Sequence, residues 1–219
     1  MKAVIFDLDG TLVDSMWVWE EIDKEFLRNL NIDPSVFNNE ELGGMSFTET
    51  ALYFKNKFNL THSVDEIKIT WNKMGATIYT EKVEIKPFVR EFLKFLKQHN
   101  IKMGIASSNS RELVELILDR FEIIDYFDCI KVSCEVERGK PFPFIYMETA
   151  KELGVLPEEC LVFEDIPDGV MAGKNAGMTV WAIRDRQSEK LVKELKTIAD
   201  KWILDYDEAR QIIIKEILC

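Results

Sequence analysis

Carboxylate side chains follow two apolar runs of the chain and carry most of its potential chemistry. Asp7 and Asp9 come directly after the run Ala3–Phe6, and Glu164 and Asp165 end a later run. Two carboxylates this close to a strand end cannot both enter an apolar core, because an unpaired buried carboxylate is very costly. A divalent cation would offset their repulsion, and Mg²⁺ prefers one or two carboxylates together with water and phosphate oxygens. The pattern favours a Mg²⁺ site in which a carboxylate attacks a phosphate ester.

Two further polar groups fit phosphate chemistry. Lys140, within Gly139–Pro141, would neutralise phosphoryl oxygens and a nucleophilic carboxylate, and Ser107 would donate a hydrogen bond to them. Taken singly, each motif also fits a structural role: Asp-Gly-Thr is a common turn, the Glu-Asp and Ser-Ser-Asn motifs can cap helices, and a lone lysine is usually solvated. The functional interpretation therefore depends on their occurring together and in this order.

The elements that position these groups are predicted from apolar periodicity. Short apolar runs rich in β-branched residues predict buried strands. They are Ala3–Phe6, Met103–Ala106, Cys129–Val132, Cys160–Phe163 and Thr179–Ile183, with Trp202–Leu204 as a candidate sixth. Helical patterns lie between them, at 88–98, 113–121, 144–153 and 170–176. This alternation predicts an α/β, Rossmann-like parallel sheet with helices on both faces, whose ligand site lies beyond the carboxyl ends of the strands.

Residues 15–86 interrupt the alternation, because they show helical patterns but no convincing strand. We expect an inserted α-helical cap domain at 15–86, folded over the active edge of the sheet, and a catalytic core domain formed by 1–14 and 87–219. The alternative is that these helices simply cover one face of the sheet.

Bulk composition narrows the class of protein. The 219 residues are 47% hydrophobic and 31% charged, as in an ordinary soluble globular protein, and the net charge is −11. Such an acidic chain is not expected to bind nucleic acid, although a small phosphate ester responds to the local field. No run of about 18 apolar residues predicts a membrane span, and the opening apolar run is broken by carboxylates, so it does not resemble a signal peptide. The oligomeric state is left open, with a monomer as the default.

The cysteines carry no metal-binding or redox motif. None of the four forms a CxxC pair, and a chain of this length needs no disulfide staples. We therefore expect reduced thiols in a cytoplasmic protein at Cys129, Cys134, Cys160 and Cys219.

The polar motifs resemble, in order, those of a known superfamily. Phe6–Ser15 resembles the first motif of the haloacid dehalogenase superfamily, Ala106–Asn109 is similar to the second, and Gly139–Pro141 to the third. The pair Glu164–Asp165, with the glycines and alanines that follow it, resembles the fourth. The resemblance covers essentially the whole chain and is closest to the β-phosphoglucomutase-like phosphatase branch, which has a helical cap.

The resemblance implies a role for each motif residue. Asp7 would be the nucleophile and a Mg²⁺ ligand, and Asp9 would be the general acid and base, binding the metal through its backbone carbonyl. Ser107 and Lys140 would hold the phosphoryl group, and Asp165, with Glu164, would complete the metal site. Dehalogenases lack the second acid of the first motif, so its presence here indicates a phosphotransferase. The remaining motif residues expected against the substrate are Gly10, Thr11, Ser108 and Asn109.

The sequence departs from the family pattern at two places. Ile166 and Pro167 follow the Glu-Asp pair, where the family often has Ser or Thr, so one hydrogen bond on the metal side is expected to be missing. Phe144 stands where Lys-Pro-x-Pro is commonly followed by Asp. Neither departure affects the lysine.

The cap is expected to choose the substrate. Gly43–Phe47 resembles the substrate-facing loop of such caps, and Trp19, Met45 and Phe47 are predicted to form an apolar wall. The alternative for these side chains is ordinary helix packing. The predicted partner is a small phosphate ester that carries a ring or carbon chain.

Three functions are compatible with these residues. The first is Mg²⁺-dependent hydrolysis of a phosphorylated metabolite, the second is a sugar-phosphate mutase, and the third is a catalytically inactive binding or regulatory protein. The third is disfavoured because every motif residue is present. β-Phosphoglucomutases place an arginine after a serine like Ser46 and a histidine four residues beyond a position like that of Ser15. Here Phe47 and Trp19 occupy those positions, so hydrolysis is favoured.

Overall fold

A parallel sheet forms the centre of the molecule. The computed structural model describes residues 1–37 and 42–216. Six parallel strands run in the order β5-β4-β1-β6-β7-β8. Their bounds are β1 (Ala3–Phe6), β4 (Lys102–Ser107), β5 (Cys129–Val132), β6 (Cys160–Glu164), β7 (Thr179–Ile183) and β8 (Lys201–Ile203). The predicted α/β fold is confirmed, and the candidate sixth strand is present as β8.

Helices cover both faces of this sheet. Successive side chains of a strand point to opposite faces, and in β1 Phe6 packs into one core cluster while Ile5 packs into another. Phe6 stacks on Phe163 of β6 with ring centroids 5.4 Å apart. The face of Phe6 is covered by α4 (Val89–Gln98), α5 (Arg111–Arg120) and α9 (Tyr206–Glu216), and that of Ile5 by α6 (Phe144–Leu153), α7 (Pro167–Asn175) and α8 (Val192–Ile198).

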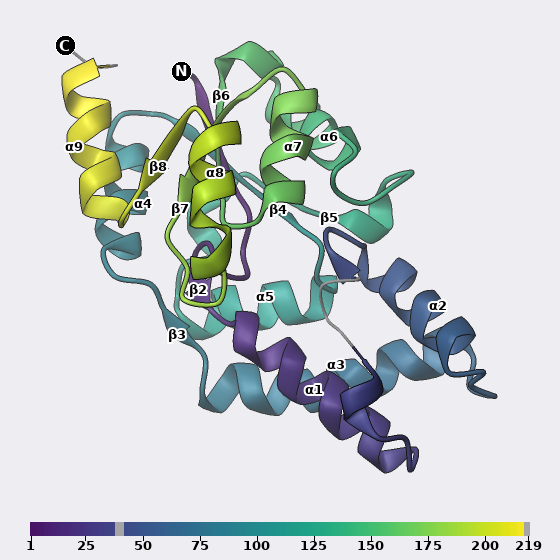
Figure 1. The fold of residues 1–219 in the computed structure, drawn as a ribbon. Helices are drawn as coiled ribbons and strands as arrows, with labels where there is room; N and C mark the ends of the chain where they lie inside the picture. Colours follow the sequence, from purple (N-terminus) through teal and green to yellow (C-terminus); the bar gives the residue numbers. More distant parts are fainter. Residues whose placement is uncertain (38–41, 217–219) are drawn as a thin grey trace.

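The described segment from residue 15 to residue 83 is helical throughout its regular structure. It contains α1 (Met16–Asn29), the 3₁₀ turn η1 (Pro34–Val36), α2 (Phe47–Lys57) and α3 (Val64–Glu81). Ser46 and Ser63 begin α2 and α3 with capping boxes, each reciprocated by a glutamate three residues on. Figure 1 shows α1, α2 and α3 as a separate lobe at one end of the sheet, with α3 lying along α5.

A two-stranded ribbon joins this lobe to the sheet. β2 (Val13–Asp14) and β3 (Glu84–Ile85) pair antiparallel where the chain leaves and returns. Arg120 of α5 donates to the carbonyl oxygens of Tyr79 and Val83, at 2.6 and 2.5 Å. The two crossings of the chain therefore lie side by side.

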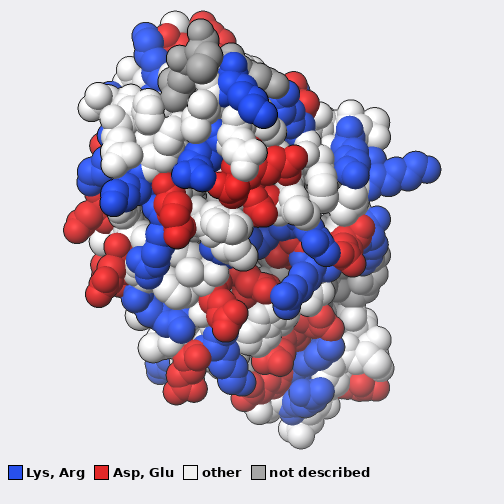
Figure 2. Space-filling view, turned by 90° about the vertical axis from the view of Figure 1, so that its left-hand side faces the viewer, with Lys and Arg blue, Asp and Glu red and all other residues white. Residues whose placement is uncertain are grey.

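Surface charge and cysteine state complete the description. Figure 2 shows basic and acidic side chains interspersed over one face of the molecule. Among the helices of the described residues, none is long and apolar enough to cross a bilayer. Cys129, Cys134 and Cys160 are free thiols, and Cys219 lies outside the described residues.

Candidate active site

Asp7 stands at the carboxyl edge of the sheet, directly after β1. Its backbone N–H donates to the carbonyl oxygen of Phe163 at 3.0 Å, so the pairing of β1 with β6 extends to this residue. The chain then turns through Gly10, whose φ of +78° suits glycine. A Cβ atom there would lie 2.1 Å from Oδ2 of Asp165. Gly10 is therefore required both by the turn and by the carboxylate that approaches it.

Lys140 joins the two groups of carboxylates. Its Nζ lies 2.6 Å from Oδ1 of Asp7 and 2.5 Å from Oε1 of Glu164, and Tyr146 donates to the same Glu164 oxygen. Burial lowers the pKa of Lys140, but the charges of Asp7 and Glu164 outweigh it and hold the pKa above its ordinary value. Burial raises the pKa of Asp7, and Lys140 opposes that rise. The lysine thus stays protonated beside the predicted nucleophile.

A buried acidic group lies next to this lysine. Asp7, Glu164 and Asp165 each offer an oxygen within 4.8 Å of the others. Burial raises the pKa of Asp165 well above its ordinary value, and the charges of Asp7 and Glu164 add to the rise. Oδ1 of Asp165 accepts a 3.2 Å hydrogen bond from Thr11, but its buried Oδ2 has no partner among the described residues. A divalent cation would supply that partner and offset the repulsion, so these residues fit one.

Glu164 plays a different part from Asp165 within this group. Its Oε1 accepts from Lys140 and Tyr146, and its Oε2 accepts from the backbone N–H of Asp165 at 3.1 Å. Both oxygens therefore already have donors. The carboxylates best placed to bind a cation directly are Asp7 and Asp165, while Glu164 holds the lysine.

The carboxylate of Asp9 is not a member of this acidic group and has donors of its own. Its Oδ1 accepts from Ser15 at 2.5 Å and from the hydroxyl of Tyr79, and its Oδ2 accepts from Asn109 at 2.9 Å. Burial raises the pKa of Asp9, and these donors oppose the rise. A role in metal binding would fall to the backbone carbonyl of Asp9, since its side chain is engaged elsewhere. Two acids only two residues apart thus have separate environments.

Three consecutive residues at the end of β4, Ser107, Ser108 and Asn109, make different contacts. Ser107 Oγ accepts from the N–H of Asn109 at 3.1 Å, which leaves its own O–H available to a ligand. The Ser108 carbonyl accepts from the N–H of Phe47 at 3.0 Å, so this residue attaches the α2 loop to the core. The Asn109 side chain holds Asp9.

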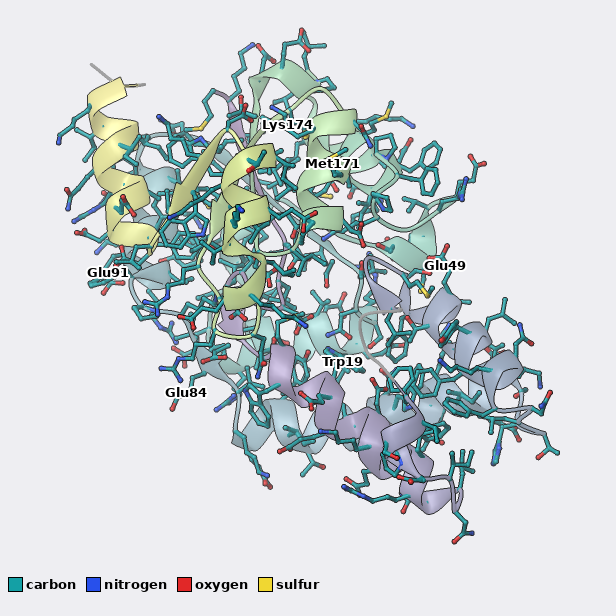
Figure 3. The ribbon with its side chains drawn as sticks, in the orientation of Figure 1. Trp19, Glu49, Glu84, Glu91, Met171 and Lys174 are labelled. Atoms are coloured by element: carbon teal, nitrogen blue, oxygen red, sulfur yellow. The ribbon has the colours of Figure 1, made fainter. Side chains whose placement is uncertain are left out.

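A cavity of about 720 Å³ lies between this edge of the sheet and the helical lobe. The described residues that the sequence predicted and that line it are Asp7, Asp9, Trp19, Met45, Phe47, Ser107, Ser108, Asn109, Lys140 and Asp165. Figure 3 shows Trp19 on α1, where the helical lobe meets the core. Gly10 and Thr11, predicted to contact substrate, instead lie against Asp165, and Glu164 lies behind Lys140.

Sequence reasoning did not find Tyr79, a residue of α3 that reaches Asp9. Its hydroxyl donates to Asp9 and accepts from Trp19 Nε1 at 3.1 Å and from Asn109 at 2.9 Å. The available signal is weak: Trp71, Gly75 and Tyr79 recur every four residues along the buried face of α3. That spacing indicates burial but not the partner.

Comparison with known proteins places the chain in a family. The haloacid dehalogenase-like hydrolase family matches residues 4–183. A phosphorylated carbohydrates phosphatase of Thermotoga maritima is 31% identical over 179 residues, which are 81% of this chain and 82% of that protein. Hexitol phosphatase B of Escherichia coli is 29% identical over 80% of each chain. A β-phosphoglucomutase of Bacillus subtilis is 34% identical over 81% of each chain. The protein belongs to the haloacid dehalogenase-like hydrolases, among the phosphatases and mutases of that family.

Solved structures agree on the fold. A β-phosphoglucomutase from Clostridium difficile has a TM-score of 0.80 at 23% identity, with 100% of both chains covered. CbbY from Rhodobacter sphaeroides, in complex with phosphate, has a TM-score of 0.78 at 22% identity, covering 95% of this chain and 96% of that one.

Proposed function

We propose that the protein is a Mg²⁺-dependent phosphatase that hydrolyses a small phosphorylated carbohydrate through an aspartyl-phosphate on Asp7. The observation that carries the proposal is the pairing of Lys140 with Asp7 beside the unpartnered oxygen of Asp165, on the floor of the cavity. This arrangement supplies a nucleophile and positive charge for a phosphoryl group. The names of the Thermotoga and Escherichia coli relatives support a carbohydrate or polyol phosphate as the substrate class.

The residues can carry two successive steps. A carboxylate oxygen of Asp7 forms a bond to phosphorus, the bond to the ester oxygen breaks, and Asp9 gives its proton to the departing alkoxide. Asp9 then takes a proton from water as that water attacks phosphorus, which releases phosphate and restores Asp7. Lys140 and Ser107 stabilise the phosphoryl oxygens throughout. Mg²⁺, when bound, supplies further positive charge beside those oxygens.

The residues that line the cap side of the cavity favour hydrolysis of the substrate over a mutase reaction. A mutase must grip a second phosphate, for which a bidentate arginine is well suited. Among the described residues that line the cavity, those from α1, α2 and α3 include no Lys or Arg, and the lining lysines, Lys140 and Lys190, both belong to the segment 87–219. Lys55 of α2 donates to the carbonyl oxygen of His62 at 2.5 Å and does not line the cavity. The mutase remains the alternative because of the Bacillus subtilis relative.

We also propose that residues 15–86 act as a cap domain that opens and closes over the core formed by 1–14 and 87–219. The ribbon of β2 and β3 supports this, because both crossings of the chain lie together and leave one narrow hinge. Closure would exclude water and complete the site. The free thiols support a cytoplasmic location.

The test is phosphate release by the purified full chain. Hydrolysis of p-nitrophenyl phosphate and of a panel of sugar and polyol phosphates should require Mg²⁺, stop in excess chelator and return when Mg²⁺ is added. β-Glucose 1-phosphate, with a trace of the bisphosphate, separates the alternatives. Free phosphate as the main product supports hydrolysis, whereas faster accumulation of glucose 6-phosphate would establish the mutase. Full activity in chelator would refute the metal requirement.

A further inference from the structure

One carboxylate on the cap side of the cavity has no part in the chemistry described so far. Asp23 lies one turn beyond Trp19 on α1, lines the cavity and is only 3% exposed. The other buried residues of this helix, Val18, Ile22, Phe26 and Leu27, are all apolar. Packing of α1 therefore does not require an acid at this position, because an apolar side chain would serve it better.

Asp23 has no partner of opposite charge within residues 1–37 and 42–216. Among the described residues, no hydrogen bond or ion pair joins its carboxylate to another side chain or to the backbone. The neighbouring charge is Glu20 on the same helix, which repels it and is itself paired with the exposed Lys24. Burial, with a smaller contribution from Glu20, raises the pKa of Asp23 to about 7. A buried acid left without donors is expected where a ligand supplies them.

A second buried polar group lines the same cavity without a partner. The indole Nε1 of Trp71, on α3, has no hydrogen-bond partner among the described residues. The ring itself is fixed edge-to-face against Phe47, with centroids 5.7 Å apart. The cap-side wall thus combines aromatic surface with one strong acceptor and one donor, a combination that orients a ligand in an otherwise apolar pocket.

The two walls differ in charge, and this fixes the direction of a bound substrate. Lys140 and the proposed cation draw a phosphate to the core wall. The opposite end of the substrate then meets the cap side of the cavity, whose lining includes Asp23, Trp19 and Trp71. A second phosphate or a carboxylate at that end would be repelled by Asp23, whereas hydroxyl groups would donate to it.

We propose that Asp23 is a specificity-determining residue that accepts hydrogen bonds from hydroxyl groups at the end of a monophosphorylated polyol or sugar opposite to the phosphate. The same carboxylate excludes substrates that carry a second anionic group there. This inference rests on the proposed phosphatase function and narrows its substrate class to hydroxyl-rich monophosphates.

Three matched esters test the proposal. Glucitol 6-phosphate and gluconate 6-phosphate differ at the far end only by a hydroxymethyl group and a carboxylate, and hexyl phosphate lacks the hydroxyls altogether. Wild-type kcat/KM should be highest for glucitol 6-phosphate. Asp23→Leu should lower that value by about 10- to 100-fold, the usual effect of losing a hydrogen bond to a charged group. It should leave hexyl phosphate within about twofold, because that ester makes no such bond.

A charge-neutral variant and a matched control complete the design. Asp23→Asn keeps an acceptor but removes the charge, so it should abolish the discrimination against gluconate 6-phosphate and carries the test if Asp23→Leu does not fold. Glu21→Leu removes the same charge from the exposed face of α1. It should leave unchanged the kcat/KM of glucitol 6-phosphate relative to that of gluconate 6-phosphate and relative to that of hexyl phosphate. If the wild type does not hydrolyse p-nitrophenyl phosphate with Mg²⁺, the proposed function fails. If it does, but glucitol 6-phosphate is not preferred or the Asp23 variants do not change the preference, the substrate inference alone is overturned.

Discussion

The two walls of the cavity are built on opposite principles. On the core wall, charged groups are held by one another: Lys140 contacts both Asp7 and Glu164, and Glu164 has donors on both oxygens. On the cap wall, aromatic rings pack edge-to-face, Nε1 of Trp71 has no hydrogen-bond partner among the described residues, and the charge beside the buried Asp23 is the repelling one of Glu20. Apart from Oδ2 of Asp165, which would bind the proposed cation, the core wall is organised before a substrate arrives, whereas we propose that the substrate completes the cap wall.

This difference assigns a distinct task to each wall. Charge that is already fixed in place stabilises a transition state without reorganisation at the moment of reaction. Unpartnered groups instead discriminate, because a ligand that fails to satisfy them leaves them buried and unpaired. Changes to the core wall should therefore act on every phosphate ester alike, and changes to the cap wall should act on some esters only.

The largest expected effect comes from the core wall, with Asp7→Asn. The amide is not a competent nucleophile, so kcat should fall by at least about 10⁴-fold on every ester, as is usual when a nucleophile is removed. The measurement is steady-state phosphate release from p-nitrophenyl phosphate and glucitol 6-phosphate, with circular dichroism to confirm folding. Near wild-type turnover by a folded variant would overturn the assignment of Asp7.

Most residues of the core wall can be predicted from the sequence because they follow apolar runs. Asp7, Ser107 and Asp165 each end or follow a strand that was predicted from apolar, β-branched residues. Parallel strands bring their carboxyl ends to one edge, so topology alone placed these side chains together. Lys140 lies in a loop without such a signal. Its charge suggested a role beside phosphoryl oxygens, and the resemblance to a family motif supported that role.

The cap wall is harder to predict from the sequence, because helical periodicity indicates which residues are buried but not which residues they contact. Trp19 and Phe47 were predicted at the cavity, but packing of the helices was an equally physical expectation. Asp23 interrupts the apolar stripe of α1, which is a usable signal, yet an isolated acid in a helix is usually solvated. Tyr79 contacts Asp9 across 70 residues of sequence, and no local pattern predicts such a long-range hydrogen bond.

An intermediate effect is expected on the cap wall, in stability, with Asp23→Asn. The folded-state pKa of Asp23 is about 7, above its ordinary 3.8, so its protonated form is favoured by folding. Stability from this group is fully present below about pH 4 and is lost as pH rises through 7. The asparagine does not titrate, so its advantage in unfolding free energy over wild type should grow by about 2 kcal/mol between pH 5.5 and pH 8.

Urea unfolding at the two pH values measures this difference. Glu21→Gln, at an exposed position of the same helix, is the matched control and should show no such growth. A variant that is less stable than wild type at pH 8 would show that Asp23 has a structural partner, and the contrast between the walls would disappear.

The smallest expected effect comes from Tyr79→Phe, because Tyr79 extends from α3 to Asp9, the proposed general acid. The substitution removes only the hydroxyl that donates to Asp9, while Ser15 and Asn109 still hold the carboxylate. Tyr79 is thus a positioning residue, and the loss of its hydroxyl should lower kcat by about tenfold, which is the lower end of the range for a hydrogen bond to a charged group.

The fall in kcat should depend on the leaving group. An alkoxide from glucitol 6-phosphate needs a proton from Asp9, whereas p-nitrophenolate leaves readily without one. A kcat deficit on the polyol ester that is several times larger than on p-nitrophenyl phosphate, with KM unchanged, would show that the cap aligns the acid of the core. Tyr126→Phe, which does not line the cavity, should affect neither ester. Equal losses on both esters would mean that Tyr79 only stabilises the closed lobe, and the two walls would then act independently.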